Sequence, residues 1–274
     1  MKIISCLRRV PVYSFLFGCG ACTALLLGSV GIYGAEPDQN RALAACLFVP
    51  PYNSDAGVLL YNVLSSYESM SVWLITLFPV FGAMPYAGAY CSEFKSCGFY
   101  LSCSRMSRRS FTLSHFAAMG LYSALTMLVS LGAVTVLCLV CCGGAASAVP
   151  LGEIARLYIS YCAYALVAGC VCIALCSAFM DTFVITSGMS LVIYILDSLY
   201  STYQLRLLAA LTRGEVTEPD PRAELLYIPF YAHGFPQFRE ATGLSPWVLV
   251  LGAAGLAAGA YGLFAFMTAR RIRL

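Results

Sequence analysis

Charged side chains are scarce in this sequence of 274 residues. Asp, Glu, Lys and Arg together make up 11% of the chain, less than half of the roughly 25% that is usual for a soluble domain. Hydrophobic residues make up 60%, and the mean hydropathy is +0.80. This composition excludes a disordered chain and a soluble globular domain, and it indicates an integral membrane protein.

Lysine is almost absent, with only Lys2 and Lys95 in the whole chain. A P-loop needs the pattern G-x-x-x-x-G-K-[ST], whose lysine and backbone N–H groups hold nucleotide phosphates. Neither lysine follows such a glycine loop, so we expect that the chain is not an enzyme and hydrolyses no ATP itself. A net charge of +3 without a basic stripe also argues against a nucleic-acid partner.

Histidine is equally rare, and cysteine lacks a disulfide pattern. His115 and His233 are expected on opposite sides of the membrane, which argues against a shared metal site. Of the 14 cysteines, only Cys46 falls clearly in a predicted outer loop, so no structural disulfide is expected. The tetrad Cys19-Gly20-Ala21-Cys22 has redox-like CxxC spacing, but with Gly18 it is more simply explained as small residues that allow close helix packing.

Long charge-free stretches are present instead. A helix needs about 20 apolar residues to cross roughly 30 Å of hydrocarbon. The sequence predicts an all-α polytopic membrane protein with a single transmembrane domain, 1–274, and six membrane-spanning helices. The predicted spans are approximately 11–34, 70–91, 116–140, 157–180, 182–200 and 246–268. Between them lie a cytoplasmic segment, 92–109, and two outer loops, 36–69 and 204–243, the second of which begins with a helical stretch, Leu205–Leu211.

Positive charge is distributed unevenly across these spans. Ten of the 16 Lys and Arg residues lie on the side that holds both chain termini. Because Lys and Arg accumulate in cytoplasmic loops, we expect the N- and C-termini in the cytoplasm and the protein in the plasma membrane.

The segment 92–109 is longer than a connection between two helices requires. It mixes charged with aromatic residues, and it predicts a short amphipathic helix over Glu93–Leu101. Such a helix would suit the docking of another protein. A helix resting on anionic membrane lipids, to which Arg105, Arg108 and Arg109 are well suited, is the alternative.

The order of residues in this segment is also informative. An acidic residue just after the second span is followed five positions later by a glycine, and then by a leucine and a Ser/Arg cluster. These residues are Glu93, Gly98, Leu101, Ser104, Ser107 and Arg108. Together with the six-span layout, the pattern resembles the permease subunit of a type-2 exporter of the ATP-binding-cassette class.

The resemblance implies particular partners. A separate cytoplasmic ATPase subunit would bind ATP and Mg²⁺, so this chain itself would hold no cofactor, and a second permease copy or a paralogue would complete a dimer. The segment 92–109 would couple the ATPase to the spans. The residues expected to carry this coupling are Glu93, Gly98, Leu101, Arg105, Arg108 and Arg109.

Asp197 is an acid within the fifth predicted span. An acid at mid-membrane costs about 2.5–3.5 kcal/mol, so it should face protein or water. Asp197 and Tyr194 would then line a translocation path, or Asp197 would mark the outer end of the span. Both interpretations stay open.

The scarcity of charge and the many aromatic residues favour export of an amphipathic or apolar substrate such as a lipid, a peptide or a drug. A non-transporting membrane anchor or sensor that recruits a cytoplasmic partner is the alternative. A proton-coupled carrier is disfavoured, because Asp197 has no intramembrane partner base in the sequence.

Overall fold

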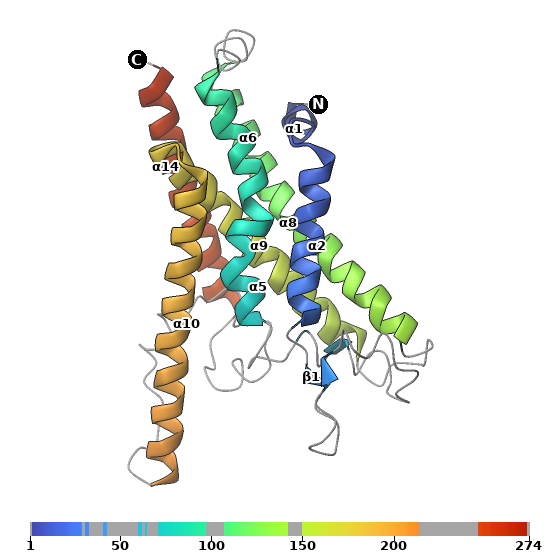
Figure 1. Cartoon of the computed structure of the whole chain (residues 1–274). Coiled ribbons are helices and arrows are strands. Elements are labelled where there is room, and N and C mark those ends of the chain that lie inside the picture. Colours follow the sequence, from blue (N-terminus) through green and yellow to red (C-terminus); the bar gives the residue numbers. More distant parts are fainter. Residues whose placement is uncertain are drawn as a thin grey trace.

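The structure is a computed structural model that describes residues 2–28, 31–32, 41–42, 60–61, 64, 71–96, 107–141, 150–213 and 246–272. Nearly all of these residues are helical, which confirms the predicted all-α class (Figure 1). The helices are α1 (Lys2–Leu7), α2 (Val12–Gly28), α5 (Ser71–Phe78), the π-helix η2 (Pro79–Ala83), α6 (Met84–Lys95), α8 (Arg108–Cys141), α9 (Leu151–Phe179), α10 (Thr182–Thr212) and α14 (Pro246–Ile272). Two short strands, β1 (Gly31–Ile32) and β2 (Arg41–Ala42), pair antiparallel.

Several helices have the length and composition of membrane spans. Among the described residues, four are long and apolar enough to cross a bilayer: Leu74–Lys95, Arg109–Val140, Leu151–Phe179 and Val250–Arg270. They lie where the second, third, fourth and sixth spans were predicted. The regions of the first and fifth predicted spans contain shorter apolar helices, Val12–Leu26 and Thr182–Leu196. The chain therefore has the helices of a membrane protein.

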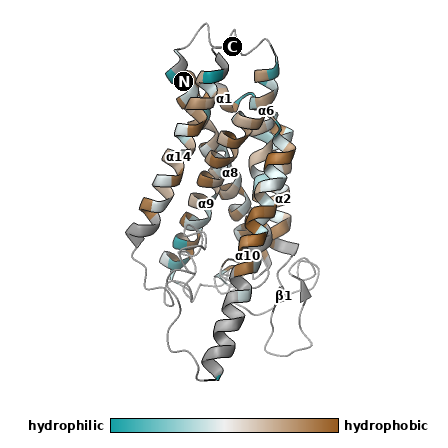
Figure 2. Cartoon of the chain, turned by 90° about the vertical axis from the view of Figure 1, so that its left-hand side faces the viewer, coloured by the Kyte–Doolittle hydropathy of each residue, from teal (hydrophilic) through white to brown (hydrophobic). Residues whose placement is uncertain are grey.

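The helices form an elongated bundle. The start of α1 and the end of α14 lie at the same end of it, which we call the terminal end (Figure 1). The end of α6 and the start of α8 lie there too. Hydrophilic residues gather near the helix ends, whereas the middle of the bundle is mostly apolar (Figure 2).

Two apolar cores follow one another along the bundle. At the terminal end, α1, α6, α8, α9 and α14 contribute buried side chains, among them Tyr86, Met119 and Phe264. At the other end, α2, α5, α8 and α9 surround Phe78 and Leu131. Helices α8 and α9 take part in both cores, and they are thus the central pair.

The second span contains a π-helical turn between α5 and α6. Pro79, its first residue, has no N–H and cannot donate to the carbonyl of Ile75, four residues earlier. The hydroxyl of Tyr164, on α9, donates to that carbonyl oxygen at 2.7 Å. A neighbouring helix thus supplies a donor, which matters because backbone polar groups inside a membrane need protein partners.

The first span is shorter than the predicted 11–34. Helix α2 ends at Gly28, and Gly31 and Ile32 belong to β1. Glycines at positions 28 and 31 disfavour continuation of the helix.

The segment 92–109 differs from its prediction as well. Its first residues end α6 at Lys95, and its last two begin α8 at Arg108, so the third helix starts earlier than 116. A single helix over Glu93–Leu101 does not form, because Ser96 has an extended backbone (φ −96°, ψ 156°). The Ser96 hydroxyl donates to the carbonyl of Glu93 at 3.0 Å, a local bond that competes with helix continuation.

Helix α10 is longer than the predicted span 182–200. It continues without a break to Thr212, so the helical stretch predicted at the start of the outer loop is part of this helix. Leucine, alanine and arginine dominate 204–211, and all three are strong helix formers. The rest of that loop, 214–243, lies outside the described residues, as does most of the loop 36–69.

Helix α2 approaches the π-helical turn closely at Gly18. A Cβ atom at this position would lie 2.7 Å from the backbone oxygen of Phe81, closer than Cβ atoms approach other atoms. At Gly20 a Cβ atom would have no neighbour within 4 Å. The close packing that the small residues predict is therefore made at Gly18 and not at Gly20.

Replacement of Tyr164 by Phe should destabilise the bundle, because the Ile75 carbonyl loses its donor from α9. We expect a loss of about 1–2 kcal/mol in the free energy of unfolding, seen as a lower midpoint of thermal unfolding in detergent. Tyr13→Phe makes the same change on a side chain that is 74% exposed, and it should leave the midpoint unchanged. Equal midpoints for the two variants would contradict this role of Tyr164.

Gly18→Ala should also lower the midpoint, by an amount equivalent to about 1–3 kcal/mol, because the added methyl group forces α2 away from Phe81. Gly20→Ala is the matched control on the same helix, and it should be neutral or slightly stabilising. A Gly20→Ala variant less stable than Gly18→Ala would show that the two helices do not meet at Gly18.

Candidate functional site

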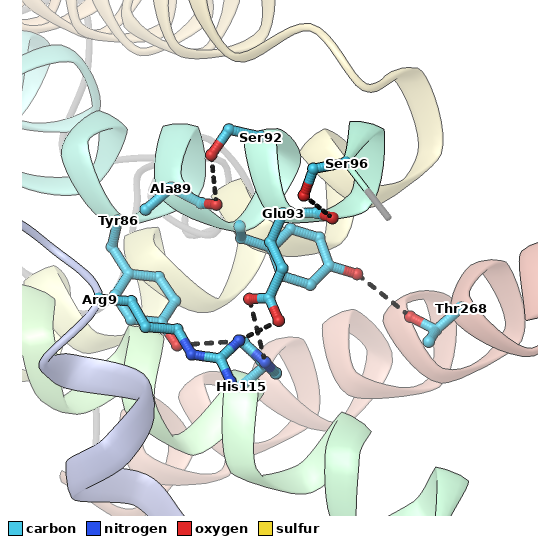
Figure 3. A network of polar contacts seen from close by, with 9 residues as sticks. Arg9, Tyr86, Ala89, Ser92, Glu93, Ser96, His115 and Thr268 are labelled. Atoms are coloured by element: carbon cyan, nitrogen blue, oxygen red, sulfur yellow. Dashed lines mark hydrogen bonds and ion pairs between the residues drawn. The ribbon is translucent and has the colours of Figure 1, made fainter. Parts of the chain in front are cut away.

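Charged and aromatic side chains from several elements meet at the terminal end of the bundle. Arg9 comes from the turn between α1 and α2, Glu93 from the last turn of α6, and His115 from the start of α8. Their polar groups point toward one another, together with the hydroxyl of Tyr86 (Figure 3). We call these four residues the charged cluster.

The helical period of α6 explains why its members face the same way. Tyr86, Tyr90 and Glu93 are separated by four and three residues, which places them on one face of the helix over two turns. The backbone of the α1–α2 turn is held by the bond from the N–H of Arg9 to the carbonyl of Cys6, at 3.2 Å. This turn carries the Arg9 side chain to the end of α6.

The carboxylate of Glu93 forms an ion pair with Arg9. The Glu93 side chain is only 14% exposed, and that of Arg9 is 39% exposed. A carboxylate withdrawn from water to this extent is costly unless an opposite charge compensates it. Arg9 provides that charge, and the pair ties the N-terminal turn to the second span.

The pKa of Arg9 reflects this pair. Burial alone would lower the pKa, but the hydrogen bond to Glu93 and the negative charge of its carboxylate outweigh burial, so the pKa is raised above its usual value. Arg9 therefore stays positively charged at any physiological pH.

His115 lies between Glu93 and Tyr86. Its Nε2 is 4.0 Å from Oε2 of Glu93, and its Nδ1 is 3.2 Å from the hydroxyl of Tyr86. The imidazole is almost fully buried. A neutral imidazole has one donor and one acceptor nitrogen, so each nitrogen has a polar group on its own side of the ring.

Aromatic rings surround this imidazole and extend the cluster to α14. The ring centroid of Phe111 is 4.4 Å from that of His115, and the Tyr90 centroid is 5.4 Å away. Tyr90 also contacts Phe264 in a tilted arrangement, with 5.4 Å between centroids, and its hydroxyl is 3.5 Å from that of Thr268. Movement of the end of α6 would thus be felt by α8 and α14 together.

Chemically, the cluster holds a half-exposed cation beside a mostly buried acid and a buried imidazole. Such a group can lock helix ends together, and it places an acid and a base next to each other. The described residues contain no group of three His, Cys, Asp or Glu side chains that would suit a metal ion. Cys19 and Cys22 of the CxxC tetrad are both buried thiols.

Of the six predicted coupling residues, Glu93 and Arg109 are described with their side chains. Glu93 is enclosed in the cluster, whereas Arg109 is exposed at the start of α8. Arg108 begins α8, and its side chain lies outside the described residues. Gly98, Leu101 and Arg105 lie outside them as well. Ser107 has a structural role, since its hydroxyl accepts the N–H of Ser110 at 3.3 Å and caps α8.

The residues proposed for a translocation path are remote from the cluster. Tyr194 and Asp197 lie in α10, and Tyr194 is 12 residues, roughly 18 Å, from the start of the helix. The Tyr194 side chain is 48% exposed on the surface of the chain. The side chain of Asp197 lies outside the described residues.

The sequence pattern of 92–109 does not connect Glu93 with Arg9, Tyr86 or His115. The spacing of Tyr86, Tyr90 and Glu93 was a usable signal for a polar face on α6. No short-range pattern links Arg9 or His115 to that face, because they are 84 and 22 residues away from Glu93 in the sequence.

Comparison with known proteins identifies no family for the chain. No protein-family model, curated protein or solved structure matches it.

Glu93→Gln should destabilise the bundle, because Arg9 loses its counter-charge. We expect a loss of about 1–2 kcal/mol in the free energy of unfolding, less than the 3–5 kcal/mol of a fully buried pair because solvent screens Arg9. The control is Glu153→Gln, which removes an ion pair with Arg156 whose two side chains are more exposed. Thermal unfolding in detergent should separate the two variants, and equal midpoints would show that the Arg9–Glu93 pair contributes no stability.

Proposed function

We propose that this chain is the transmembrane permease subunit of an ATP-driven exporter of the type-2 ATP-binding-cassette class. A separate cytoplasmic ATPase subunit binds ATP and Mg²⁺, and this chain provides the path through the membrane. The proposal rests on the residue pattern from Glu93 to Arg109 and on the contacts of Glu93.

The contacts of Glu93 are the observation that supports the proposal most. Glu93 lies in the last turn of α6, at the start of the segment in which an ATPase would dock. It is ion-paired with Arg9 before α2, and it lies 4.0 Å from His115 on α8. A displacement imposed on that segment would therefore reach three helices at once, as coupling to an ATPase requires. Because Glu93 is enclosed, its role is to transmit the motion, and exposed neighbours such as Lys95 and Arg109 meet the partner.

The charges at the terminal end support a cytoplasmic location for both termini. The exposed cations described there are Arg8, Arg9, Lys95, Arg109 and Arg270. The described acids at this end are Glu93 and Asp181. This excess of positive charge is typical of the cytoplasmic side of a plasma-membrane protein.

In the proposed arrangement α2 and α10 complete six spans. Both have apolar stretches shorter than 18 residues, which local thinning of the bilayer can accommodate. Large apolar side chains are exposed along α10, including Phe183, Leu191 and Ile195. Such a surface fits lipid or a second permease copy, and the pairing of two copies would enclose a path for an amphipathic or apolar substrate.

A pull-down from detergent-solubilised membranes tests the partner. The tagged chain should bring down a soluble protein that carries a P-loop, identified by mass spectrometry. Lys95→Glu and Arg109→Glu should each reduce its recovery roughly tenfold or more, because a misplaced charge at an interface costs several kcal/mol. The control is Arg213→Glu, which also replaces a cation by an acid but lies just after α10, far from the terminal end. This variant should leave recovery of the ATPase unchanged.

Three results would count against the exporter. A folded chain that brings down no ATPase, or one that brings down a different soluble protein, would favour the membrane anchor or sensor. Equal loss with Arg213→Glu would show that general surface charge, and not the terminal end, determines recovery.

A proton-coupled carrier is the second candidate. The observation that favours it is the juxtaposition of Glu93 and His115, an acid and a base within helices of membrane-spanning length. Reconstituted vesicles distinguish the two functions. An exporter moves its substrate only with its ATPase and ATP, whereas a carrier moves it with a pH gradient alone and loses transport on His115→Gln.

A further inference from the structure

A groove opens near the terminal end between the start of α2, α6 and the start of α10. Its volume is about 580 Å³. The residues that line it are Arg9, Pro11, Met84, Pro85, Gly88, Ala89, Ser92, Thr182 and Phe183.

Helix α6 forms the floor of the groove. The floor runs from Met84 to Ser92, eight residues apart and thus about 12 Å along the helix axis. Ser92 and the neighbouring Arg9 make one end polar, whereas Met84 and Pro85 make the other end apolar. This length is close to the roughly 15 Å hydrocarbon depth of one leaflet, half of the bilayer core.

The flanking helices open the groove toward the membrane. Val12 and Tyr13, at the start of α2, are 71% and 74% exposed, and Phe183 and Val184, at the start of α10, are 66% and 62% exposed. Exposed apolar side chains on both flanks indicate that this side of the bundle faces lipid.

The polar end is suited to an anion. The Arg9 side chain is 39% exposed, and a guanidinium carries five N–H donors in a geometry that suits phosphate. Of the nearby acids, Glu93 pairs with Arg9, and Asp181 accepts the N–H of Val184 at 3.1 Å to cap α10. Exposed Arg8, next to Arg9, adds a further positive charge.

We propose that this groove binds one anionic phospholipid, with its phosphate at Arg9 and one acyl chain along α6 from Ser92 to Met84. A cation at one end of an apolar floor, at the level where headgroups meet hydrocarbon, matches the chemistry of that lipid. A soluble anion would use only the polar end. The proposal requires only that the chain lies in a membrane, and it is independent of the exporter function.

Native mass spectrometry of the purified full chain tests the proposal. With added phosphatidylglycerol we expect one molecule to be retained at activation energies that strip the other lipids. We expect phosphatidylcholine to be retained roughly tenfold less, because its choline cation cancels the phosphate charge and is repelled by Arg8 and Arg9. The test changes the lipid headgroup and leaves Arg9 in place, because a substitution of Arg9 would also break its ion pair with Glu93.

Gly88→Leu should fill the groove and abolish this retention. A Cβ atom at Gly88 meets no neighbour within 4 Å, so the side chain enters the groove without displacing the backbone. Gly262→Leu, on α14, is the matched control, since its Cβ atom is equally unhindered, and it should retain the lipid. Circular dichroism and gel filtration verify that both variants fold.

Three outcomes would overturn the proposal. Equal retention of the two lipids, unaffected by Gly88→Leu, would show only non-specific lipid at the surface. Displacement of the phosphatidylglycerol by inorganic phosphate would assign the polar end to a soluble anion. A change in oligomeric mass on Gly88→Leu, with lipid retention unchanged, would assign the groove to a second copy of this chain.

Discussion

The ion pair between Arg9 and Glu93 is the interaction on which the terminal end of the bundle depends. A carboxylate that is 14% exposed at the end of an apolar helix needs a compensating charge, and the one it has lies 84 residues earlier in the chain. To supply it, the α1–α2 turn must pack against α6. That packing places Arg9 beside the Tyr86–His115 contact that α6 and α8 make (Figure 3), and it also forms one wall of the groove.

Inside the bundle, side-chain hydroxyl groups donate hydrogen bonds to backbone carbonyl groups that water would satisfy in a soluble protein. Ser130, buried on α8, donates to the carbonyl of Thr126 in its own helix at 2.8 Å, and it lies 3.1 Å from the carbonyl of Cys19 on α2. Tyr161 donates to the carbonyl of Leu64 at 3.0 Å. Without water in the hydrocarbon, such side chains hold helices in register more specifically than apolar packing alone.

Hydrophobicity was enough to predict the helices, because a charge-free stretch of about 20 residues has few other stable states in a bilayer. Hydrophobicity alone did not predict where the helices begin and end. The continuation of α10 to Thr212 includes Arg206, and the early start of α8 includes Arg108 and Arg109, so both lie beyond the charge-free stretches. Local helix propensity decides the first, and capping by Ser107 helps to decide the second. The polar segment 92–109 was recognised as unusual, but the enclosure of Glu93 followed from Arg9, a distant partner that no local pattern reveals.

The π-helical turn at Pro79–Ala83 sets the rotational phase of α6 relative to the helix that precedes it. A π turn accommodates about one residue more than an α turn, and one residue corresponds to about 100° of rotation. Deletion of a single residue there would let the turn close as an ordinary α turn, so Tyr86 and Glu93 would still face His115. The turn therefore marks the place in the second span where the chain can lose one residue without rotating the charged cluster, whereas a deletion farther along α6 would shift Glu93 by about 100° relative to Tyr86.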